Sequence, residues 1–242
     1  MVLFLQLIGF VVCFLLVYHF LTRKYLNPYK LIMVFGKKGS GKSTLLTKTA
    51  LKYLDMGRPV YTTEDIPGCY KISFEDIGVY EFPPESVLLI DEVGMKWDNR
   101  NYKDFKPSTR DFFKLQRHRK IIVYLFSQTF DVDKKIRDLT DEMYLVEKKF
   151  RVFSYAKRIL KKPCLTTSEN SKEGESKITE DLYFDSLLFF WCGSRRFTFI
   201  PKYAGMFDSF EAPRLLEKEF ELVPLNCPVK TKRNWFKGGK AA

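Results

Sequence analysis

Residues Gly36 to Ser43 read GKKGSGKS and match the phosphate-binding pattern G-x-x-x-x-G-K-[ST] at every fixed position. The run before them, Leu31–Phe35, has strand character, and the run after them, Thr44–Leu51, has helix character. In that context backbone N–H groups and the positive end of the helix dipole converge on a phosphate. A glycine-rich turn without function is the alternative, and the flanking strand and helix argue against it. The stretch therefore predicts a P-loop that binds a nucleoside triphosphate.

The P-loop assigns most of the expected ligand contacts. Lys42 is expected to reach the β- and γ-phosphates, and Ser43 is expected to hold Mg²⁺. ATP and Mg²⁺ are therefore the cofactors that the sequence predicts. The residues expected to contact the nucleotide are Gly36, Lys37, Lys38, Gly39, Ser40, Gly41, Lys42, Ser43 and Thr44.

A second apolar run, Val87–Ile90, ends in Asp91 and Glu92. Four consecutive apolar residues are typical of a strand that is covered on both faces, as in a parallel sheet. The acidic pair after it is a Walker B pattern, in which Asp91 contacts Mg²⁺ through water. Glu92 is placed to orient and activate the attacking water, which favours an ATPase over a small-molecule kinase. An acidic pair that merely closes a strand is the alternative.

A third strand is expected over Ile121–Phe126, followed by Ser127 and Gln128. In hydrolysing P-loop proteins a polar residue often ends the strand beside the Walker B strand, where it senses the γ-phosphate. Gln128 is the candidate for that role. A residue that hydrogen bonds within the next loop is the alternative, and the sequence does not separate the two.

An arginine finger stabilises charge on the transferring phosphoryl group and is commonly supplied by a neighbouring subunit. The candidates are Arg110, Arg117, Arg119 and Arg137. Arg137 is preferred slightly, because it follows the Gln128 strand in a short predicted helix. For each of them a solvated surface position is the alternative.

Strands alternate with helical segments, which favours a three-layer α/β P-loop NTPase with a mainly parallel sheet. Further strands are expected near Tyr80–Phe82, over Phe150–Tyr155 and over Ser186–Cys192, and a helix over Ser108–Arg119. The expected organisation has a transmembrane anchor with a basic flank (1–24), an NTPase core (28–160), a flexible linker or loop (161–180) and a C-terminal extension packed on the core (181–242). The polar composition of Thr166–Thr179 is the reason for the linker.

The N-terminal run Val2–Leu21 is almost entirely apolar and would rise roughly 30 Å as a helix, enough to cross a bilayer. Arg23, Lys24 and Lys30 follow it, and no basic residue precedes it. The positive-inside tendency therefore predicts a single-pass protein of the cytoplasmic (inner) membrane of a bacterial host, with the N-terminus outside and the ATPase domain in the cytoplasm. A cleaved signal peptide is disfavoured, since a positive n-region and a small-residue cleavage site are missing.

The formal net charge is +12, which indicates an anionic partner such as nucleic acid or an anionic membrane face. A generally basic composition is the alternative. The five cysteines form no C-x-x-C pair and fit a reducing compartment. The segment Lys230–Lys240 is basic with interleaved aromatic residues, so nucleic-acid contact, membrane contact and a disordered end all remain open for it.

Five segments occur in one order along the chain: GKKGSGKS, VLLIDE, RHRKIIVYLFSQ, DVDKKIRDLTDE and PKYAGMFDSFE. Together they resemble the zonula occludens toxin family, which includes the inner-membrane assembly ATPase of filamentous phages. The resemblance covers Leu31 to Glu211. It implies an ATPase that drives single-stranded phage DNA through the envelope while coat proteins are added, and it implies a homo-oligomeric ring. One difference is the predicted span, which here precedes the ATPase domain, whereas the phage ATPases place it afterwards.

Three functions fit these observations. The first is a membrane-anchored, Mg²⁺-dependent ATPase for filamentous phage assembly and export. The second is a DNA translocase or partition motor, which would share the same catalytic residues. The third is a membrane-tethered nucleotide-binding scaffold with little turnover, against which the intact set Lys42, Ser43, Asp91 and Glu92 argues.

Overall fold

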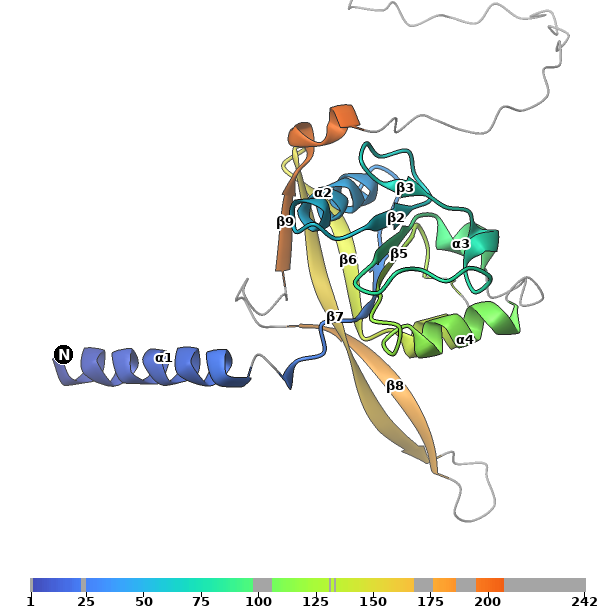
Figure 1. Cartoon of the computed structure of the whole chain (residues 1–242). Helices are drawn as coiled ribbons and strands as arrows, with labels where there is room; N and C mark the ends of the chain where they lie inside the picture. The colour runs from blue at the N-terminus through green and yellow to red at the C-terminus, as the bar shows by residue number, and fades with distance from the viewer. Residues whose placement is uncertain are drawn as a thin grey trace, which may run out of the picture. The chain divides into compact units, whose positions relative to one another are not determined.

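In the computed structural model the three apolar runs form the centre of one sheet, as β1 (Leu31–Phe35), β4 (Val87–Ile90) and β5 (Ile122–Ser127) (Figure 1). Every residue of these strands is buried, because helices cover both faces of the sheet. The structure describes residues 2–22, 25–97, 106–130, 132, 134–167, 176–185 and 195–206.

Within these residues the sheet is mixed but mainly parallel, with the order β3-β2-β4-β5-β1-β6-β7-β8 and with β9 paired to β7. The parallel strands to either side of the centre are β2 (Val60–Thr62), β3 (Tyr70–Lys71) and β6 (Glu142–Lys149). β5 lies between β1 and β4 and pairs with both. The P-loop strand and the Walker B strand are therefore separated by one strand.

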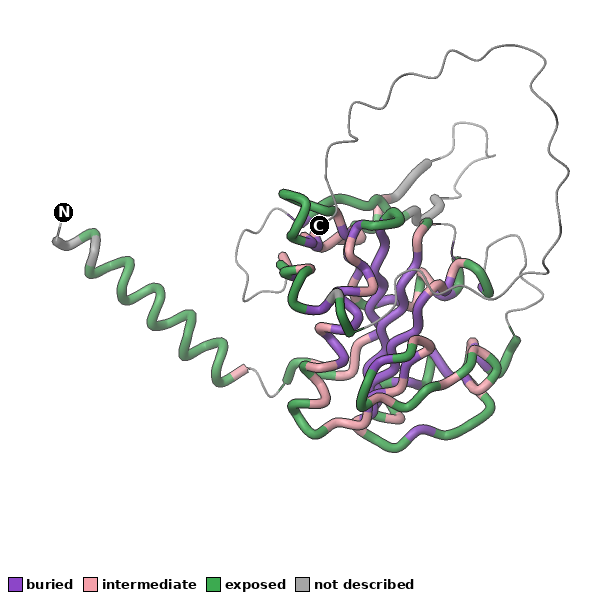
Figure 2. The backbone as a smooth tube through the Cα atoms, turned by 90° about the horizontal axis from the view of Figure 1, so that it is seen from above, coloured by how far each residue is buried: buried purple, intermediate pink, exposed green. Residues whose placement is uncertain are grey.

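Alternation along the central strands divides the core into two clusters, one on each face. Ile32 and Val34 face α2 (Lys42–Asp55), which contributes Leu45, Leu46 and Ala50. Leu31 and Met33 belong to the opposite cluster, which contains residues of α3 (Val93–Lys96), α4 (Pro107–Leu115) and α5 (Lys134–Leu139). Figure 2 shows the buried strands running between more exposed segments. The α/β architecture with a mainly parallel sheet is thus confirmed.

Antiparallel strands extend the sheet beyond β6. β7 (Phe153–Thr167) pairs over its first half with β6 on one edge and with β9 (Arg195–Phe199) on the other. Over its second half β7 pairs with β8 (Ser176–Phe184), which forms a long two-stranded ribbon (Figure 1). Short 3₁₀ helices lie at Phe74–Asp76, Ile200–Lys202 and Ala204–Met206.

The structure corrects several predicted boundaries. The flexible segment 161–180 is wrong for 161–167 and 176–180, which are strands; 168–175 lie outside the described residues. Near 80–82 there is only an isolated bridge between Ile77 and Tyr80, and residues 150–152 form a turn before β7. The strand predicted over 186–192 also lies outside the described residues.

The N-terminal helix α1 runs from Val2 to Thr22, and its large apolar side chains from Phe4 onward are exposed wherever they are described. Within the part of the chain that the structure describes, no helix combines the length and hydropathy needed to cross a membrane. The predicted membrane anchor therefore stays a prediction. The chain divides into two units, Met1–Ser209 and Phe210–Ala242. The second unit, with the basic segment 230–240, lies outside the described residues.

Candidate nucleotide-binding site

Three polar segments meet where β1, β5 and β4 end. The P-loop follows β1, Gln128 follows β5, and the pair Asp91–Glu92 follows β4. Because these strands are parallel and adjacent, their carboxyl ends lie at one edge of the sheet, where open α/β sheets bind ligands. The P-loop is tied to the β5 end, since the Gly36 backbone N–H donates to the Ser127 carbonyl over 3.1 Å.

Two P-loop glycines sit where a larger residue would not fit. A Cβ on Gly36 would lie 2.6 Å from Ser40 Oγ and 2.8 Å from the Val146 carbonyl oxygen. Gly41 caps α2 with a left-handed φ of +93°, and a Cβ there would lie 2.7 Å from Ser154 Cβ. Both positions require glycine for close backbone approach, and Gly41 also requires it for its dihedral angle.

Lys42 is the first residue of α2, and only 8% of it is exposed. Its ammonium group donates to the carbonyl oxygens of Gly36 at 2.6 Å and Lys37 at 3.2 Å. Burial lowers the pKa of this amine below its ordinary value. The nearby charges of Asp91 and Glu92 act in the other direction and offset part of that decrease. The cation is therefore held across its own loop, facing the two acids.

Asp91 is only 6% exposed, and burial raises its pKa. Hydrogen bonds from the Glu92 backbone N–H, at 2.8 Å, and from the Ser43 hydroxyl oppose that rise, as does the charge of Lys42. The Asp91 backbone N–H donates to Thr63 Oγ1 over 2.9 Å, which fixes the end of β4. The structure thus places both predicted magnesium ligands, Ser43 and Asp91, near each other.

Glu92 and Gln128 also meet: the Gln128 side-chain amide donates to the Glu92 carboxylate. Glu92 has a left-handed backbone, with φ +52° and ψ +37°, which is uncommon for a residue other than glycine. Such strained residues cluster at functional sites, where the surrounding structure holds them in place. The structure therefore places Gln128 beside Glu92, and the γ-phosphate sensor role expected of Gln128 stays a prediction.

The residues present fit a triphosphate and a magnesium ion. Ser43 and Asp91 offer the hydroxyl and carboxylate oxygens that Mg²⁺ prefers. Ser40 Oγ is buried and has no hydrogen-bond partner among the described residues, as expected for a group that awaits an anion's oxygen. Lys37, Lys38 and Gly39 are exposed at the tip of the loop, while Thr44 is buried on α2.

The arginine candidates differ in what they contact. The guanidinium of Arg137 lies over the Phe130 ring, 4.7 Å from its centroid, and donates to the Phe130 carbonyl at 3.1 Å. Arg110 pairs with Asp111 at 3.2 Å, and Arg119 lies over Phe112. Arg117 is exposed. Arg137 is thus engaged within its own chain, and the assignment of the finger stays a prediction.

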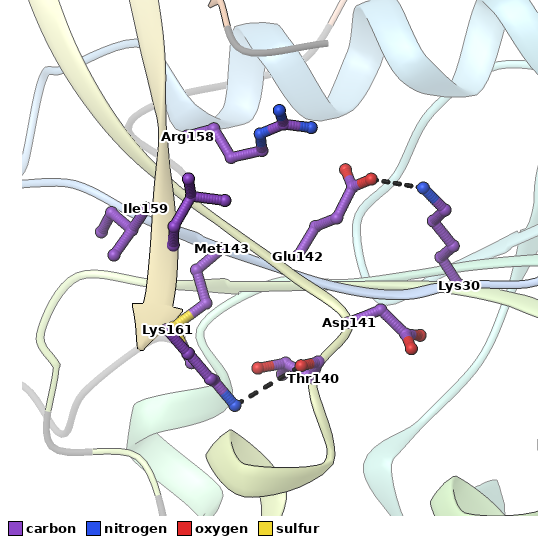
Figure 3. Close-up of a pocket in the computed structure, with 9 residues that line it drawn as sticks. Lys30, Thr140, Asp141, Glu142, Met143, Arg158, Ile159 and Lys161 are labelled. Carbon is purple, nitrogen blue, oxygen red and sulfur yellow. Dashed lines mark hydrogen bonds and ion pairs between the residues drawn. The ribbon is translucent and has the colours of Figure 1, made fainter. Parts of the chain in front are cut away.

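A cavity of about 290 Å³ lies at the opposite end of the sheet, and Figure 3 shows residues that line it. It is lined by Lys30, which precedes β1, by the first residues of β6, and by the middle of β7. Its charged groups are bound to one another or to backbone: Lys30 pairs with Glu142, and Lys161 donates to carbonyl oxygens at the end of α5, among them that of Arg137 at 2.6 Å. Arg158 pairs with the buried Asp185. These pairings account for the charges without a ligand.

Sequence reasoning missed three residues that make contacts around the nucleotide site with partners distant along the chain. Ser154 of β7 lies against Gly41, and Thr63 bonds the backbone of Asp91. Lys48 of α2 donates to the Phe197 carbonyl of β9. Ser154 and Thr63 are far in sequence from the motifs they contact, and Phe197 is far in sequence from Lys48, so only the tertiary fold identifies these contacts.

No protein-family model matches the chain, and no curated protein matches it. Solved structures do. The N-terminal domain of zonular occludens toxin from Neisseria meningitidis is 16% identical, with 65% of this chain and 95% of that chain covered and a TM-score of 0.39. The genome packaging NTPase B204 from Sulfolobus turreted icosahedral virus 2, in complex with ATP-gammaS, is 16% identical, with 52% and 77% covered and a TM-score of 0.41.

The flagellar accessory protein FlaH from Methanocaldococcus jannaschii is 15% identical, with 53% of this chain and 77% of that chain covered and a TM-score of 0.39. The chain is therefore similar to a zonular occludens toxin domain, to a genome packaging NTPase and to FlaH, at 15–16% sequence identity and TM-scores of 0.39 to 0.41.

Proposed function

We propose that this protein is a Mg²⁺-dependent P-loop ATPase. The observation that carries the proposal is the meeting of the P-loop with Asp91, Glu92 and Gln128 at one edge of the sheet. A buried lysine, a serine hydroxyl and two acids in that arrangement are the parts that phosphoryl transfer to water needs.

Each residue has a role that follows from its contacts. The P-loop amides and Lys42 bind and orient the triphosphate, and Ser43 and Asp91 hold the metal. When bound, Mg²⁺ neutralises charge on the phosphate oxygens. Glu92 positions the attacking water and accepts its proton, and Gln128 fixes the direction of the Glu92 carboxylate. Burial of Lys42 strengthens its interaction with the phosphates.

ATP hydrolysis by the full chain in detergent tests the proposal. Lys42→Ala removes the phosphate-binding cation and Glu92→Gln removes the base, so each is expected to lower kcat by at least about a hundredfold. Lys52→Ala is the matched control, because Lys52 is an exposed lysine of the same helix. Hydrolysis that persists in both variants would contradict the proposal, as would tight ATP binding by the unaltered chain without turnover.

We also propose that α1 anchors the chain in a bacterial cytoplasmic membrane, with the ATPase domain on the cytoplasmic side. The exposed apolar side chains along α1 and the lysines that follow it support this. Membranes from expressing cells, washed in alkaline carbonate, should retain the full chain. Release into the supernatant would contradict the anchor.

The cellular role that we propose is assembly and export of filamentous phage by a homo-oligomeric ring, with coat proteins and single-stranded DNA as partners. Its support is the ordered set of motifs from GKKGSGKS to PKYAGMFDSFE. Neighbouring genes test it. Small coat-like proteins and a replication initiator beside this gene are the expected result, whereas plasmid or chromosome partition genes would contradict the role.

A further inference from the structure

The outer face of β7 and β9 carries a block of aromatic side chains. Phe153 and Tyr155 of β7 lie opposite Phe199 and Phe197 of β9, respectively. The intervening residue, Ser154, is buried, so alternation places the aromatic residues on the other face. We call Phe150, Phe153, Tyr155, Phe197 and Phe199 the aromatic block; Phe150 lies in the turn that joins β6 to β7.

The rings pair across the strands and remain open to solvent. Ring centroids are 5.4 Å apart for Phe153 and Phe199, and 4.6 Å apart for Tyr155 and Phe197. Phe197 is 47% exposed, Phe199 46%, and Phe150 88%. An open hollow of about 490 Å³ is lined by Lys149 and four residues of the block. Exposed rings that form a continuous patch indicate a binding surface.

Positive charge borders the aromatic block at both ends. The cross-strand register pairs Lys149 of β6 with Phe153 at one end of the block. At the other end, Lys157 of β7 follows Tyr155 on the same face and is paired with Arg195 of β9. Among the described residues of these cross-strand pairs, Glu147 of β6, which is paired with Tyr155, is the acidic one. Lys157 contacts it at 3.1 Å and Lys149 at 3.6 Å, and the hydrogen bond from Lys157 lowers its pKa. The surface is therefore aromatic at its centre and cationic overall.

We propose that this face binds single-stranded nucleic acid, with bases stacked on the aromatic block and phosphates attracted by the excess positive charge of Lys149, Lys157 and Arg195 over Glu147. The proposal deepens the proposed function and rests on it, because the strand would be the polymer on which the ATPase acts. Aromatic rings stack unpaired bases whatever their sequence, and flanking cations follow the backbone. A duplex offers no unstacked base, and a second copy of this face would bring like charges together.

The buried side of the same strands touches the nucleotide site. Ser154, between two residues of the block, packs against Gly41 and lies 3.5 Å from its carbonyl oxygen. Lys48 of α2 donates to the backbone carbonyl of Phe197. A strand bound on the outer face is thus one sheet thickness from the P-loop and its helix.

Fluorescence anisotropy with the full chain in detergent tests the proposal, using labelled oligo-dT of about 16 nucleotides and a duplex of equal length. The oligo-dT is expected to bind more tightly than the duplex. Phe197→Ala and Phe199→Ala are each expected to weaken oligo-dT binding about five- to hundredfold. Tyr80→Ala is the matched control, since Tyr80 is exposed elsewhere.

Two further variants separate stacking from other contacts. Phe197→Leu keeps an apolar side chain but loses the ring, so it should weaken binding nearly as much as alanine does. Lys149→Gln combined with Lys157→Gln should reduce the slope of log affinity against log salt by about 1.4, because each lysine contributes about 0.7 on single strands.

Unchanged affinity in the Phe197 and Phe199 variants would overturn the proposal. Full oligo-dT binding by Phe197→Leu would also overturn it, because an apolar side chain without a ring would then suffice. So would variants that keep oligo-dT binding but lose self-association or vesicle binding, because the face would then bind a second copy or a membrane. ATPase activity without DNA, measured on the same preparations, shows whether a variant is folded. Lys42→Ala should still bind oligo-dT without nucleotide, so failure of the surface is distinguishable from failure of the ATPase.

Discussion

Among single residues, Gly41 and Gly39 make a matched pair within the P-loop. Both have left-handed backbones, with φ of +93° and +71°, so alanine costs each about 1–2 kcal/mol of stability. At Gly39 nothing lies within 4 Å of the added Cβ, whereas at Gly41 that atom would overlap Ser154 Cβ at 2.7 Å. Gly41→Ala is therefore expected to lower the free energy of unfolding more than Gly39→Ala, and to weaken ATP binding as well.

Urea unfolding and titration with a fluorescent ATP analogue measure the two effects. Ser154→Gly in the Gly41→Ala background should restore part of the lost stability, because it removes the atoms that overlap. Equal destabilisation by the two alanine variants would contradict the packing described for Gly41.

The local motifs allowed the P-loop residues, Asp91 and Glu92 to be predicted, because they follow apolar strands in a fixed spacing. The left-handed backbone of Glu92 was not predictable, since Glu itself has no preference for that region. Contact between Gln128 and Glu92 depends on β5 lying beside β4, which is a property of strand order and leaves no local pattern.

For the secondary-structure elements, the start of β6 provides a pH-dependent test. Glu142 is bonded by Lys30 and by the Tyr144 hydroxyl at 2.8 Å, with Arg196 at 3.7 Å. Burial raises the pKa of Glu142, but these partners outweigh it, and the pKa lies below its ordinary value. A carboxyl whose folded-state pKa is lowered stabilises the fold above its unfolded pKa, and this stabilisation is lost as pH falls through the folded value.

The free energy of unfolding is therefore expected to fall more steeply in the unaltered protein than in Glu142→Gln between about pH 6 and about pH 3. Urea unfolding across that range measures the slopes. Glu81→Gln is the control, because Glu81 is exposed. Parallel curves for the unaltered protein and Glu142→Gln would contradict the role of this network.

The elements of the parallel sheet were predictable because a strand buried on both faces is a continuous apolar run. The β7–β8 ribbon was not, because its composition is polar and reads as a linker. Cross-strand pairing along nine residue pairs forms that ribbon, and strand formation depends on such pairing more than on composition. Composition alone therefore misassigned residues 161–167 and 176–180.

At the level of the whole molecule, the aromatic block and the P-loop lie on opposite sides of β7 and β9. Binding of a strand at one surface and of nucleotide at the other should be coupled, since Ser154 and Lys48 contact both structures. Coupling between two ligands is reciprocal, so each must change the affinity for the other by the same factor.

Lys48→Met removes the bond from α2 to the Phe197 carbonyl while leaving the outer face unaltered. Oligo-dT affinity without nucleotide should change less than about twofold, a difference worth under about 0.5 kcal/mol. In the unaltered protein, a non-hydrolysable ATP analogue should change oligo-dT affinity about fivefold or more, and oligo-dT should change the affinity for that analogue equally. In Lys48→Met both factors should approach one, whereas Lys52→Met, on the exposed side of α2, should preserve them. Because the two factors are measured by independent titrations, inequality between them would show that the two titrations do not report the same pair of binding equilibria. Full coupling in Lys48→Met would contradict a role for the bond between Lys48 and Phe197 in the coupling.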